Sequence, residues 1–451
     1  MRLALIYPGM GKRPGQRYLR SWQMEPLPSA ALAGLTPPDV HVQFHDDRME
    51  PIPYDDPVDL VAISVETYTA RRAYQIASEY RARSVPVVMG GFHATLCPDE
   101  VTRYAEAVVE GEAEAVWPQL IDDFRHGCLQ PRYAAADRPG LAGVRYDRSI
   151  FAGRRYLPVG LVETGRGCRF RCEFCAVQSF FAASHRARPI DHVVAEIRAR
   201  RDQVRLFFFI DDNFAADIGA AKELLRALVP LRIRWVTQMS INAAHDEEFL
   251  QLLRDSGCQG VLIGLESLEP GNLRQMNKSF NTTRGGYQAA VANLRRHGIR
   301  IYATFVFGYD RDTPQSARES ADFAIEQRFF ITAFNHLTPF PGTPLYERLL
   351  REGRFTHPQW WLDETYSYNV VPFRPRGMSA AELREACLDA RHRFYRASSI
   401  LRRGFDRVNG AGLFMFSNFF LINWMHRREI GVRDHHPLGD PSWNRPLLQV
   451  H

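Results

Sequence analysis

Three of the seven cysteines lie within eight residues, as Cys168, Cys172 and Cys175 in the stretch CRFRCEFC. Gaps of three and two residues allow one loop to bring three thiolates toward a common centre, and soft thiolates suit iron–sulfur clusters or zinc. A closed zinc site needs a fourth ligand, for which His185 is the nearest candidate, and simple 4Fe–4S carriers use four cysteines. No second pair of cysteines follows. We therefore expect three protein thiolates and one metal position open to a substrate or cofactor.

Charge and composition indicate in which cellular compartment the protein works and which kinds of partner it binds. Arg166, Arg169 and Arg171 flank the cysteines and are expected to favour their thiolate forms. An odd cysteine count in a long chain argues against a disulfide framework. The net charge of +6 comes from dispersed arginines, and without a basic block or a nucleic-acid motif we expect no nucleic-acid partner. The N-terminal RLALIYP predicts a strand, not a signal peptide, so we expect a cytoplasmic protein.

The cysteines must be positioned by the elements around them, which repeat a strand–helix rhythm over residues 161–351. Six apolar runs predict strands, at 161–165, 205–212, 233–240, 260–267, 299–308 and 329–343. Six such units fit a partial or complete barrel of parallel strands. The cysteines follow the first of these strands, at the end where barrel chemistry is done.

The first block, residues 1–135, shows the same alternation with five strand candidates, at 3–8, 40–46, 59–66, 86–91 and 105–111. A helix is predicted over 69–84 from its apolar spacing. This pattern predicts a doubly wound parallel sheet, whose ligands bind at the carboxyl ends of the strands. Residues 136–160, rich in Pro and Gly, are expected to form a linker or a short hairpin.

The last block, residues 352–451, has no strand rhythm and is predicted to be a mainly helical domain that covers the barrel mouth. Its aromatic residues could form a small core or line a pocket for an apolar or planar substrate. The apolar stretch 411–425 is shorter than the roughly 20 residues needed to cross a bilayer. It could pack on the barrel or lie on a membrane surface. Four arginines are candidates for binding an anionic group of the substrate: Arg374, Arg376, Arg402 and Arg403.

The spacing CxxxCxxC, with Phe174 before the last cysteine, resembles the radical S-adenosylmethionine (radical SAM) superfamily. Three further segments resemble its cobalamin-binding branch in the right order: FFFIDDNF at 207–214, GVLIGLESLEP at 260–270 and LTPFPGTPLYERL at 337–349. The resemblance covers about 190 residues and implies that the cysteines hold a 4Fe–4S cluster. It further implies that S-adenosylmethionine is contacted by Phe174, Asp211, Asp212, Asn213, Gln238, Glu266 and Ser267.

A doubly wound domain before such a core resembles the cobalamin-binding domain of the same branch. The implied cobalamin contacts are Ser64, Glu66, Thr67, Gly90, Gly91, His93, Glu110 and Gly111. For the two glycines a tight turn, and for His93 a hydrogen-bonded turn residue, are alternatives. The cobalt-ligating motif DxHxxG is missing from the loop after the first strand, at 7–16, which has no histidine. It occurs as DHHPLG at 434–439, which we interpret as coincidence.

The resemblance implies an enzyme that methylates an unactivated carbon through a 5′-deoxyadenosyl radical and methylcobalamin. The alternative within enzymes is radical cyclisation, oxidation, rearrangement or carbon–carbon coupling, with a vestigial or differently used cobalamin domain. A distant alternative is a non-catalytic iron–sulfur or zinc-binding protein. The expected partners are a small-molecule substrate, apolar or planar with an anionic group, such as an isoprenoid or a tetrapyrrole. An electron donor such as flavodoxin or ferredoxin is also expected. No residue is assigned a catalytic role from the sequence.

Overall fold

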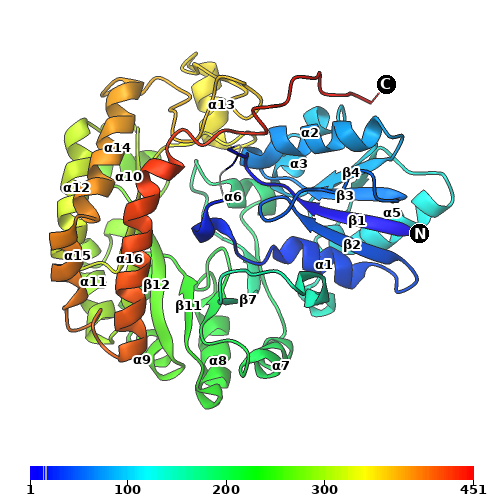
Figure 1. Cartoon of the computed structure of the whole chain (residues 1–451). Coiled ribbons are helices and arrows are strands. Elements are labelled where there is room, and N and C mark those ends of the chain that lie inside the picture. The colour runs from blue at the N-terminus through cyan, green and yellow to red at the C-terminus, as the bar shows by residue number, and fades with distance from the viewer. Residues whose placement is uncertain (14, 16–17, 451) are drawn as a thin grey trace.

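The structure, a computed structural model, describes residues 1–13, 15 and 18–450 (Figure 1). Its first sheet has six parallel strands in the order β2-β1-β3-β4-β5-β6. The strands are β1 (Arg2–Tyr7), β2 (His41–Asp46), β3 (Leu60–Ser64), β4 (Val87–Gly90), β5 (Ala107–Glu110) and β6 (Arg132–Ala134). The sequence did not predict β6, a short strand of which only Tyr133 is buried.

Helices cover both faces of this sheet, which is why its central strands are apolar throughout. One face packs against α1 (Leu27–Leu35) and α5 (Trp117–Arg125). The other packs against α2 (Ala70–Arg81) and the region of α3 (Phe92–Leu96) and α4 (Pro98–Val101). Strands buried on both faces read as continuous apolar runs. The predicted doubly wound fold is confirmed.

The second sheet also has six parallel strands, and they follow chain order: β14-β13-β12-β11-β10-β7. They are β7 (Gly160–Val162), β10 (Phe207–Phe209), β11 (Trp235–Gln238), β12 (Cys258–Glu266), β13 (Arg300–Phe307) and β14 (Ile331–His336). The helices between or after them are α7 (Ile190–Arg200), α8 (Ile218–Leu228), α9 (Glu247–Asp255), α10 (Pro270–Gln275), α11 (Gly286–Arg296), α12 (Pro314–Glu326) and α13 (Pro344–Arg351). Since β14 and β7 are the two ends of the sheet, the predicted barrel is a partial one.

Alternation along the strands separates the core from the barrel interior. On β13, Ile301, Ala303 and Phe305 are buried in the hydrophobic core with residues of the outer helices. Tyr302 and Thr304, which point the other way, are only half-buried. The interior of the partial barrel is therefore lined by side chains that are not fully packed.

Residues 136–160 contain two short 3₁₀ turns, not a hairpin. This segment lies on the first domain, where Phe151 joins the core and Arg154 Nη2 bonds Glu50 Oε1 at 2.6 Å. The division of the chain into blocks of 1–135, 136–160, 161–351 and 352–451 stays a prediction.

The C-terminal region is helical, as predicted, with α14 (Ala380–Phe394), α15 (Ala397–Gly404) and α16 (Leu413–Arg433). Among these helices α14 packs on β14 and α12, and α16 packs on α14 and α15 (Figure 1). The tail then returns to the first domain, where Leu448 N–H bonds Ser78 Oγ at 2.9 Å. No helix of the described residues is long and apolar enough to cross a membrane.

Candidate functional site

The cysteines lie in a loop bracketed by an antiparallel hairpin that the sequence did not predict. Its strands are β8 (Gly165–Gly167) and β9 (His185–Ala187). Cys172 is buried, whereas Cys168 and Cys175 are half-buried. Cys175 is the N-cap of the short α6 (Ala176–Phe181). Cys168 Sγ accepts from Asn213 Nδ2 at 3.5 Å. The hairpin thus presents three sulfurs beside the end of β10.

One lysine, not the neighbouring arginines, supplies positive charge to the sulfurs. Burial raises the pKa of Cys172 to about 12, and Lys278 opposes this shift. Lys278 Nζ lies 2.7 Å from Glu266 Oε1 and 5.8 Å from the centre of the Phe174 ring. We expected the three arginines to stabilise the thiolates, but each of them is either paired with other groups or exposed.

The three arginines have separate environments. Arg166 is surrounded by carboxylates, as described below. Arg169 pairs with Asp217 at 2.9 Å on the surface, and its side chain is 57% exposed. Arg171 is exposed as well. Only proximity along the chain suggested that they act on the thiols, and a hairpin turns them away.

Two carboxylates at the end of β10 hold the cysteine hairpin in place. Asp211 Oδ1 accepts from the N–H groups of Thr164, at 2.6 Å, and Gly165, at 3.0 Å, and Asp211 also bonds the Thr164 hydroxyl. Asp212 Oδ2 accepts from Gly167 N–H at 2.7 Å. Burial raises the pKa of Asp211 to about 7 and that of Asp212 to about 6. Both residues therefore position the loop, and Asp212 alone of the two stays half-buried beside a cavity.

The remaining predicted contacts for S-adenosylmethionine gather at neighbouring strand ends. Asn213 bonds Ser240 N–H at 3.0 Å, and Gln238 Nε2 donates to Asp211 O at 2.7 Å. Glu266 and Ser267 are buried at the end of β12. Phe174 is half-buried near Lys278. The structure brings these residues to the same end of the barrel as the cysteines.

A bulge in β12 sets the direction of Glu266. The pairing of β12 with β13 shifts register between Gly264 and Glu266, and Glu266 has φ +66°. A Cβ atom at Gly264 would lie 2.0 Å from Glu266 Oε1 and 2.7 Å from Lys278 Nζ. A side chain at this position would push the Glu266–Lys278 pair out of its present place at the strand end.

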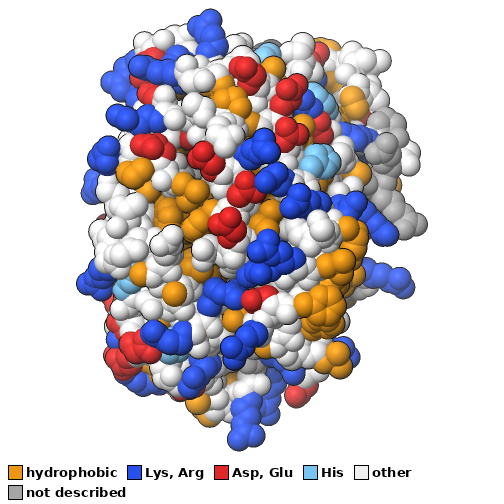
Figure 2. All heavy atoms as spheres, turned by 90° about the vertical axis from the view of Figure 1, so that its left-hand side faces the viewer, with side chains coloured by type: hydrophobic (Ala, Val, Ile, Leu, Met, Phe, Trp, Pro, Cys, Tyr) orange, Lys and Arg blue, Asp and Glu red, His pale blue; other side chains and the backbone are white. Residues whose placement is uncertain are grey.

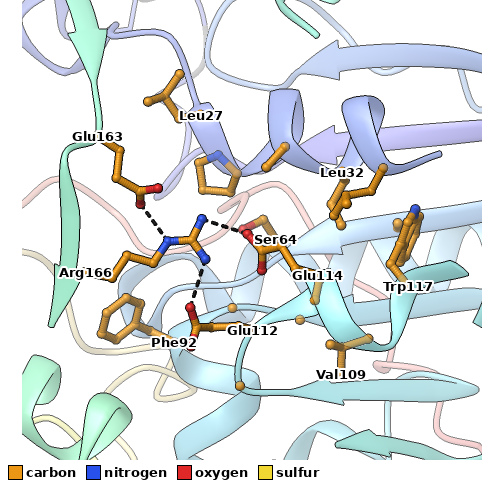
Figure 3. A pocket seen from close by; sticks show the side chains of 18 of the residues that line it. Leu27, Leu32, Ser64, Phe92, Val109, Glu112, Glu114, Trp117, Glu163 and Arg166 are labelled. Carbon is orange, nitrogen blue, oxygen red and sulfur yellow. Dashed lines mark hydrogen bonds and ion pairs between the residues drawn. The ribbon is translucent and has the colours of Figure 1, made fainter. Parts of the chain in front are cut away.

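A cavity of about 300 Å³ lies at the carboxyl ends of the first sheet (Figure 3). Its apolar wall is formed by α1, through Leu27, Ala31 and Leu32, and by Trp117. Strand-end residues Ser64, Gly90, Gly91 and Gly111 complete it. Gly91 has φ +102°, and a Cβ atom there would lie 2.8 Å from Val65 O. The cavity reaches across to the barrel, since Asp212 and Ile210 also line it.

Arg166 connects the two domains at the rim of this cavity. Its guanidinium contacts Glu163 at 2.7 Å, Glu114 at 2.7 Å and Glu112 at 2.9 Å (Figure 3). Glu112 is further paired with Arg186 at 2.6 Å. Because Glu112 and Glu114 follow β5 and Glu163 follows β7, this network fixes the first sheet against the cysteine hairpin.

Residues 162–324 match the radical SAM superfamily. The chain is 32% identical over 389 residues to bacteriochlorophyllide d C-12(1)-methyltransferase of Chlorobaculum tepidum, covering 84% of each chain. It is 30% identical over 346 residues to the C-8(2)-methyltransferase of the same organism, covering 73% of this chain and 77% of the relative. The solved radical SAM methyltransferase TsrM of Kitasatospora setae, with cobalamin and a [4Fe–4S] cluster bound, has a TM-score of 0.61 at 20% identity, covering 85% of this chain and 81% of TsrM.

The chain belongs to the cobalamin-binding radical SAM enzymes. Both relatives that are at least 30% identical are methyltransferases, so methyl transfer is favoured over the cyclisation and coupling alternatives. The likeness to TsrM shows the shared fold.

The residues of this radical SAM enzyme fit the three groups that the family binds. Three cysteines and no further cysteine nearby are the donor set of a cluster with one open iron. Among the described residues no group of three His, Cys, Asp or Glu could hold one metal ion. Thiolates that bind three different irons need not converge on a single point. The cavity under α1, walled by aliphatic side chains and open at glycines, suits a planar base and its sugar.

The cavity divides the predicted cobalamin contacts into two groups. Ser64, Glu66, Gly90, Gly91 and Gly111 line it. Three others point elsewhere. The Glu110 carboxylate lies 3.5 Å from Arg132 at the sheet edge. Thr67 Oγ1 is 3.4 Å from His93 Nδ1 inside the core. The proposed cobalamin contacts are therefore reduced to the first group.

His93, which was expected to contact cobalamin, is buried in the core of the first domain. The ring is fully buried, and its Nε2 lies 3.1 Å from Glu100 Oε1. Glu100 also accepts from Trp361 Nε1 at 2.9 Å and from the Tyr74 hydroxyl at 2.8 Å. His93 thus belongs to a hydrogen-bonded core network, which is the alternative that the sequence left open.

The DHHPLG segment folds back onto the loop after β1, where the cobalt-ligating motif would be expected. In this part of the chain Pro14, Gln16 and Arg17 lie outside the described residues. Gly439 bridges Gly11, and His436 Nε2 lies 3.1 Å from Gly11 O. The His436 ring is buried against Tyr18 and Trp22, and its Nδ1 is enclosed. His436 therefore joins the tail to the first domain, and its enclosed Nδ1 is not open to a cobalt ion.

Sequence reasoning missed three groups of site residues. Lys278 lies twelve residues after Glu266, and only the bulge brings them together. Arg166 was singled out, but two of its three acidic partners, Glu112 and Glu114, come from the other domain. The apolar wall of α1 reads as ordinary core spacing.

Proposed function

We propose that the enzyme methylates an unactivated carbon of a planar tetrapyrrole of the bacteriochlorophyllide type. One observation carries this proposal. The two relatives that are 32% and 30% identical to this chain are both named as methyltransferases of bacteriochlorophyllide d, and they act at two different positions of it. A tetrapyrrole is planar, largely apolar and often anionic, which agrees with the substrate expected from the sequence.

The inner face of the partial barrel is the surface proposed to receive the ring system. Half-buried apolar side chains point inward from successive strands, among them Phe208, Val236, Leu262 and Val306. When bound, the cluster with S-adenosylmethionine supplies the hydrogen-abstracting radical, and cobalamin supplies the methyl group. The strand-end residues hold the first two at the barrel end, while the cavity under α1 holds the nucleotide tail of the third. Enclosing the substrate between them excludes water from the reacting carbon.

The test is a mass measurement under anaerobic conditions. Cluster-reconstituted enzyme with bound cobalamin is given bacteriochlorophyllide d and S-adenosylmethionine carrying a trideuterated methyl group, with dithionite as reductant. The proposal expects product that is heavier by one labelled methyl group, together with 5′-deoxyadenosine. Product that lacks the label but has lost hydrogen or gained a ring would favour the cyclase or oxidase alternative. Absence of product with every tetrapyrrole offered would overturn the substrate class.

An electron donor of the flavodoxin or ferredoxin kind is proposed to dock at the cysteine hairpin. Arg169 and Arg171 are exposed there and offer positive charge to an acidic donor. The seven cysteines are free thiols in the structure, which agrees with a reducing compartment, and we propose the cytoplasm.

A peripheral contact with an anionic membrane is proposed for the outer side of α15 and α16. Leu413 is 84% exposed and Phe405 72% exposed, and Leu421 and Trp424 continue this apolar strip. Exposed arginines flank the strip: Arg402, Arg407, Arg427 and Arg428. Figure 2 shows hydrophobic side chains gathered among Lys and Arg side chains on this side of the molecule. Such a surface complements anionic headgroups. We expect the protein to float with phosphatidylglycerol vesicles but not with phosphatidylcholine vesicles, and Leu421→Asp to lose this flotation. Equal flotation with the two kinds of vesicle would contradict the proposal.

A further inference from the structure

A small cavity of about 50 Å³ opens on the side of the barrel interior where β13 and β14 meet α14 and α16. Its polar lining includes Tyr302, Asn335, Tyr368, Arg391, His426 and Arg433. Of the described residues that line it, none is acidic. The space is large enough for a carboxylate or a few waters and too small for a ring system. Because Tyr302, Ala333 and Asn335 alternate inward along their strands, the cavity is a side chamber of the barrel interior.

Arg391 is the central cation of this chamber. Its Nε donates to Phe334 O at 2.9 Å, and its Nη2 lies 3.1 Å from Asn335 Oδ1 and 3.4 Å from Asn369 Oδ1. These acceptors are all neutral. Within the described chain Arg391 makes no ion pair with a carboxylate, although its side chain is half-buried. Removing a charge from water without a counter-ion costs free energy. An anion that enters the chamber would therefore be attracted by the Arg391 guanidinium, which no carboxylate of the described chain neutralises.

Arg433 supplies a second guanidinium from the opposite wall. Its Nη2 bonds Ser21 Oγ at 2.8 Å and Glu429 Oε2 at 2.6 Å, which neutralises part of its charge. Its Nε is buried without a hydrogen-bond partner. Burial and the charge of Arg433 lower the pKa of His426 to about 4, so this imidazole is neutral near pH 7. Burial raises the pKa of Tyr302, whose hydroxyl remains a donor. The chamber therefore presents donors and positive charge.

A purely structural role explains only part of Arg391. The Nε bond satisfies a carbonyl on β14, the strand at the open end of the sheet, and Tyr395 serves the same strand by donating to Thr332 O at 2.9 Å. That bond uses only the Nε–H of Arg391, and its Nη2 reaches only the neutral amides of Asn335 and Asn369. A planar guanidinium with spare donors, facing the interior beside a second one, is the arrangement that recognises carboxylates bidentately.

We propose that this chamber binds a carboxylate of the substrate, with Arg391 as the principal contact and Arg433 as the second. The proposal deepens the proposed function and rests on it, since it describes how an anionic tetrapyrrole is oriented. An acid group held at β13 and β14 leaves the ring system in the apolar interior, between the barrel end that carries the cysteines and the first domain. The arginines expected from the sequence do not serve this purpose. Arg403, for example, is fully buried and donates to Phe329 O and Phe394 O.

The first test compares an acid with its ester. Pyropheophorbide a, a chlorin with one propionic acid, and its methyl ester are titrated by fluorescence into cobalamin-loaded, cluster-reconstituted enzyme. We expect the acid to bind the wild type at least about ten-fold more tightly than the ester. Arg391→Gln should remove this preference, and Arg391→Lys should keep part of it. The matched control is Arg393→Gln, two residues along α14, which pairs with Asp322 at 3.0 Å and lies outside the chamber. It should behave as the wild type. Equal affinities of acid and ester for the wild type overturn the proposal.

The second test does not depend on a tetrapyrrole. Sodium propionate, balanced against chloride at constant ionic strength, is expected to raise the melting temperature of the wild type and of Arg393→Gln more than that of Arg391→Gln. If neither chlorin binds but this difference is observed, the tetrapyrrole assignment fails and the anion chamber stands. If the chlorins bind and propionate shifts all three proteins equally, without a preference for the acid, the chamber proposal fails and the substrate class stands.

Discussion

The cavity under α1 and the chamber at β14 differ most in charge. The first, of about 300 Å³, has an apolar wall and five acidic residues at its rim with one arginine among them: Glu66, Glu112, Glu114, Glu163 and Asp212. The second, of about 50 Å³, has two arginines and, among its described lining residues, no acid. Both open toward the space between the same two sheets. Two ligands that must meet in one interior are therefore offered opposite electrostatic environments.

This difference teaches how the enzyme can separate ligands that are both large and mostly apolar. Apolar walls alone would accept either ring system, because hydrophobic burial is not directional. If cobalamin binds there, carboxylates at the first cavity would accept hydrogen bonds from the amide groups of its corrin and would repel a carboxylate. Arginines at the second attract that carboxylate. In a low-dielectric interior these Coulomb terms are larger than in water, so charge decides the placement that shape leaves open.

The cysteines line neither cavity. Replacing them is expected to have the largest effect of all the changes, because it should remove S-adenosylmethionine cleavage and leave cobalamin binding in place. Cys168→Ala, Cys172→Ala or Cys175→Ala is expected to lose the cluster and at least about 1,000-fold of S-adenosylmethionine cleavage. Cobalamin binding should persist, since none of the three cysteines lines the α1 cavity, to which their loop and hairpin contribute Gly165, Arg166 and Phe181. Iron content, 5′-deoxyadenosine and cobalamin absorbance measure this.

Cys128→Ala is the matched control, because Cys128 is an exposed thiol far along the chain from the others. It should retain cluster and activity. Unfolding of the three variants, seen as lost circular dichroism, would instead indicate a structural cluster.

Filling the first cavity should abolish cofactor binding and leave the chamber intact. Ala31 faces the cavity from α1 and is half-buried. Ala31→Trp places an indole where a planar base would lie and is expected to weaken cobalamin binding by about 100-fold or more through steric exclusion. Ala31→Ser, nearly the same size, should bind as the wild type. Equilibrium dialysis of cobalamin gives the affinities. A wild-type affinity for Ala31→Trp would place cobalamin elsewhere, whereas the propionate shift should be unchanged in both variants.

Much of the fold was predictable because parallel strands buried on both faces leave long apolar runs in the sequence. Runs such as LVAIS at β3 and FFF at β10 carry this pattern. The hairpin of β8 and β9 was not predictable, since Gly165–Gly167 and His185–Ala187 show no apolar alternation. Its pairing depends on Asp212, which binds Gly167 N–H from another strand.

The candidate site was predictable to the extent that its residues stand at strand ends. Cys168, Glu266 and Gly91 could be found in this way, because the topology alone brings strand ends together. Arg391 and Lys278 could not, since one reaches the interior from a helix on the far side of an edge strand and the other depends on a bulge. His93 shows the converse error, because a strand-end position does not say which way a side chain points.

The acidic rim of the first cavity should cost stability when no ligand is bound, and pH can measure that cost. Burial raises the pKa of Asp212 from 3.8 to about 6. The folded state then binds this proton more tightly than the unfolded state does, so the contribution is complete below pH 4 and is lost as pH rises through 6. Asp212→Asn keeps an acceptor for Gly167 N–H and removes the titration.

Without cobalamin, we expect the melting temperature of the wild type to fall relative to Asp212→Asn between pH 4.5 and 7.5. Two pKa units correspond to at most about 3 kcal/mol, or a few degrees in a protein of this size. Asp202→Asn, on a carboxyl that is 93% exposed, should follow the wild type at every pH. A difference that grows in the opposite direction would mean that Arg166, rather than burial, dominates at Asp212.

The smallest effect is expected at Arg169, and it sets the surface arginines apart from those in the chamber. Its pair with Asp217 joins side chains that are 57% and 38% exposed, and such pairs contribute about 0–1 kcal/mol. Arg169→Ala should change cluster content and dithionite-driven S-adenosylmethionine cleavage by less than about two-fold. With a reduced flavodoxin as donor, the same variant should lose more, because the exposed cation then meets an acidic partner. Equal losses with both reductants would mean that Arg169 acts on the cluster itself, and the division between surface and interior arginines would not hold.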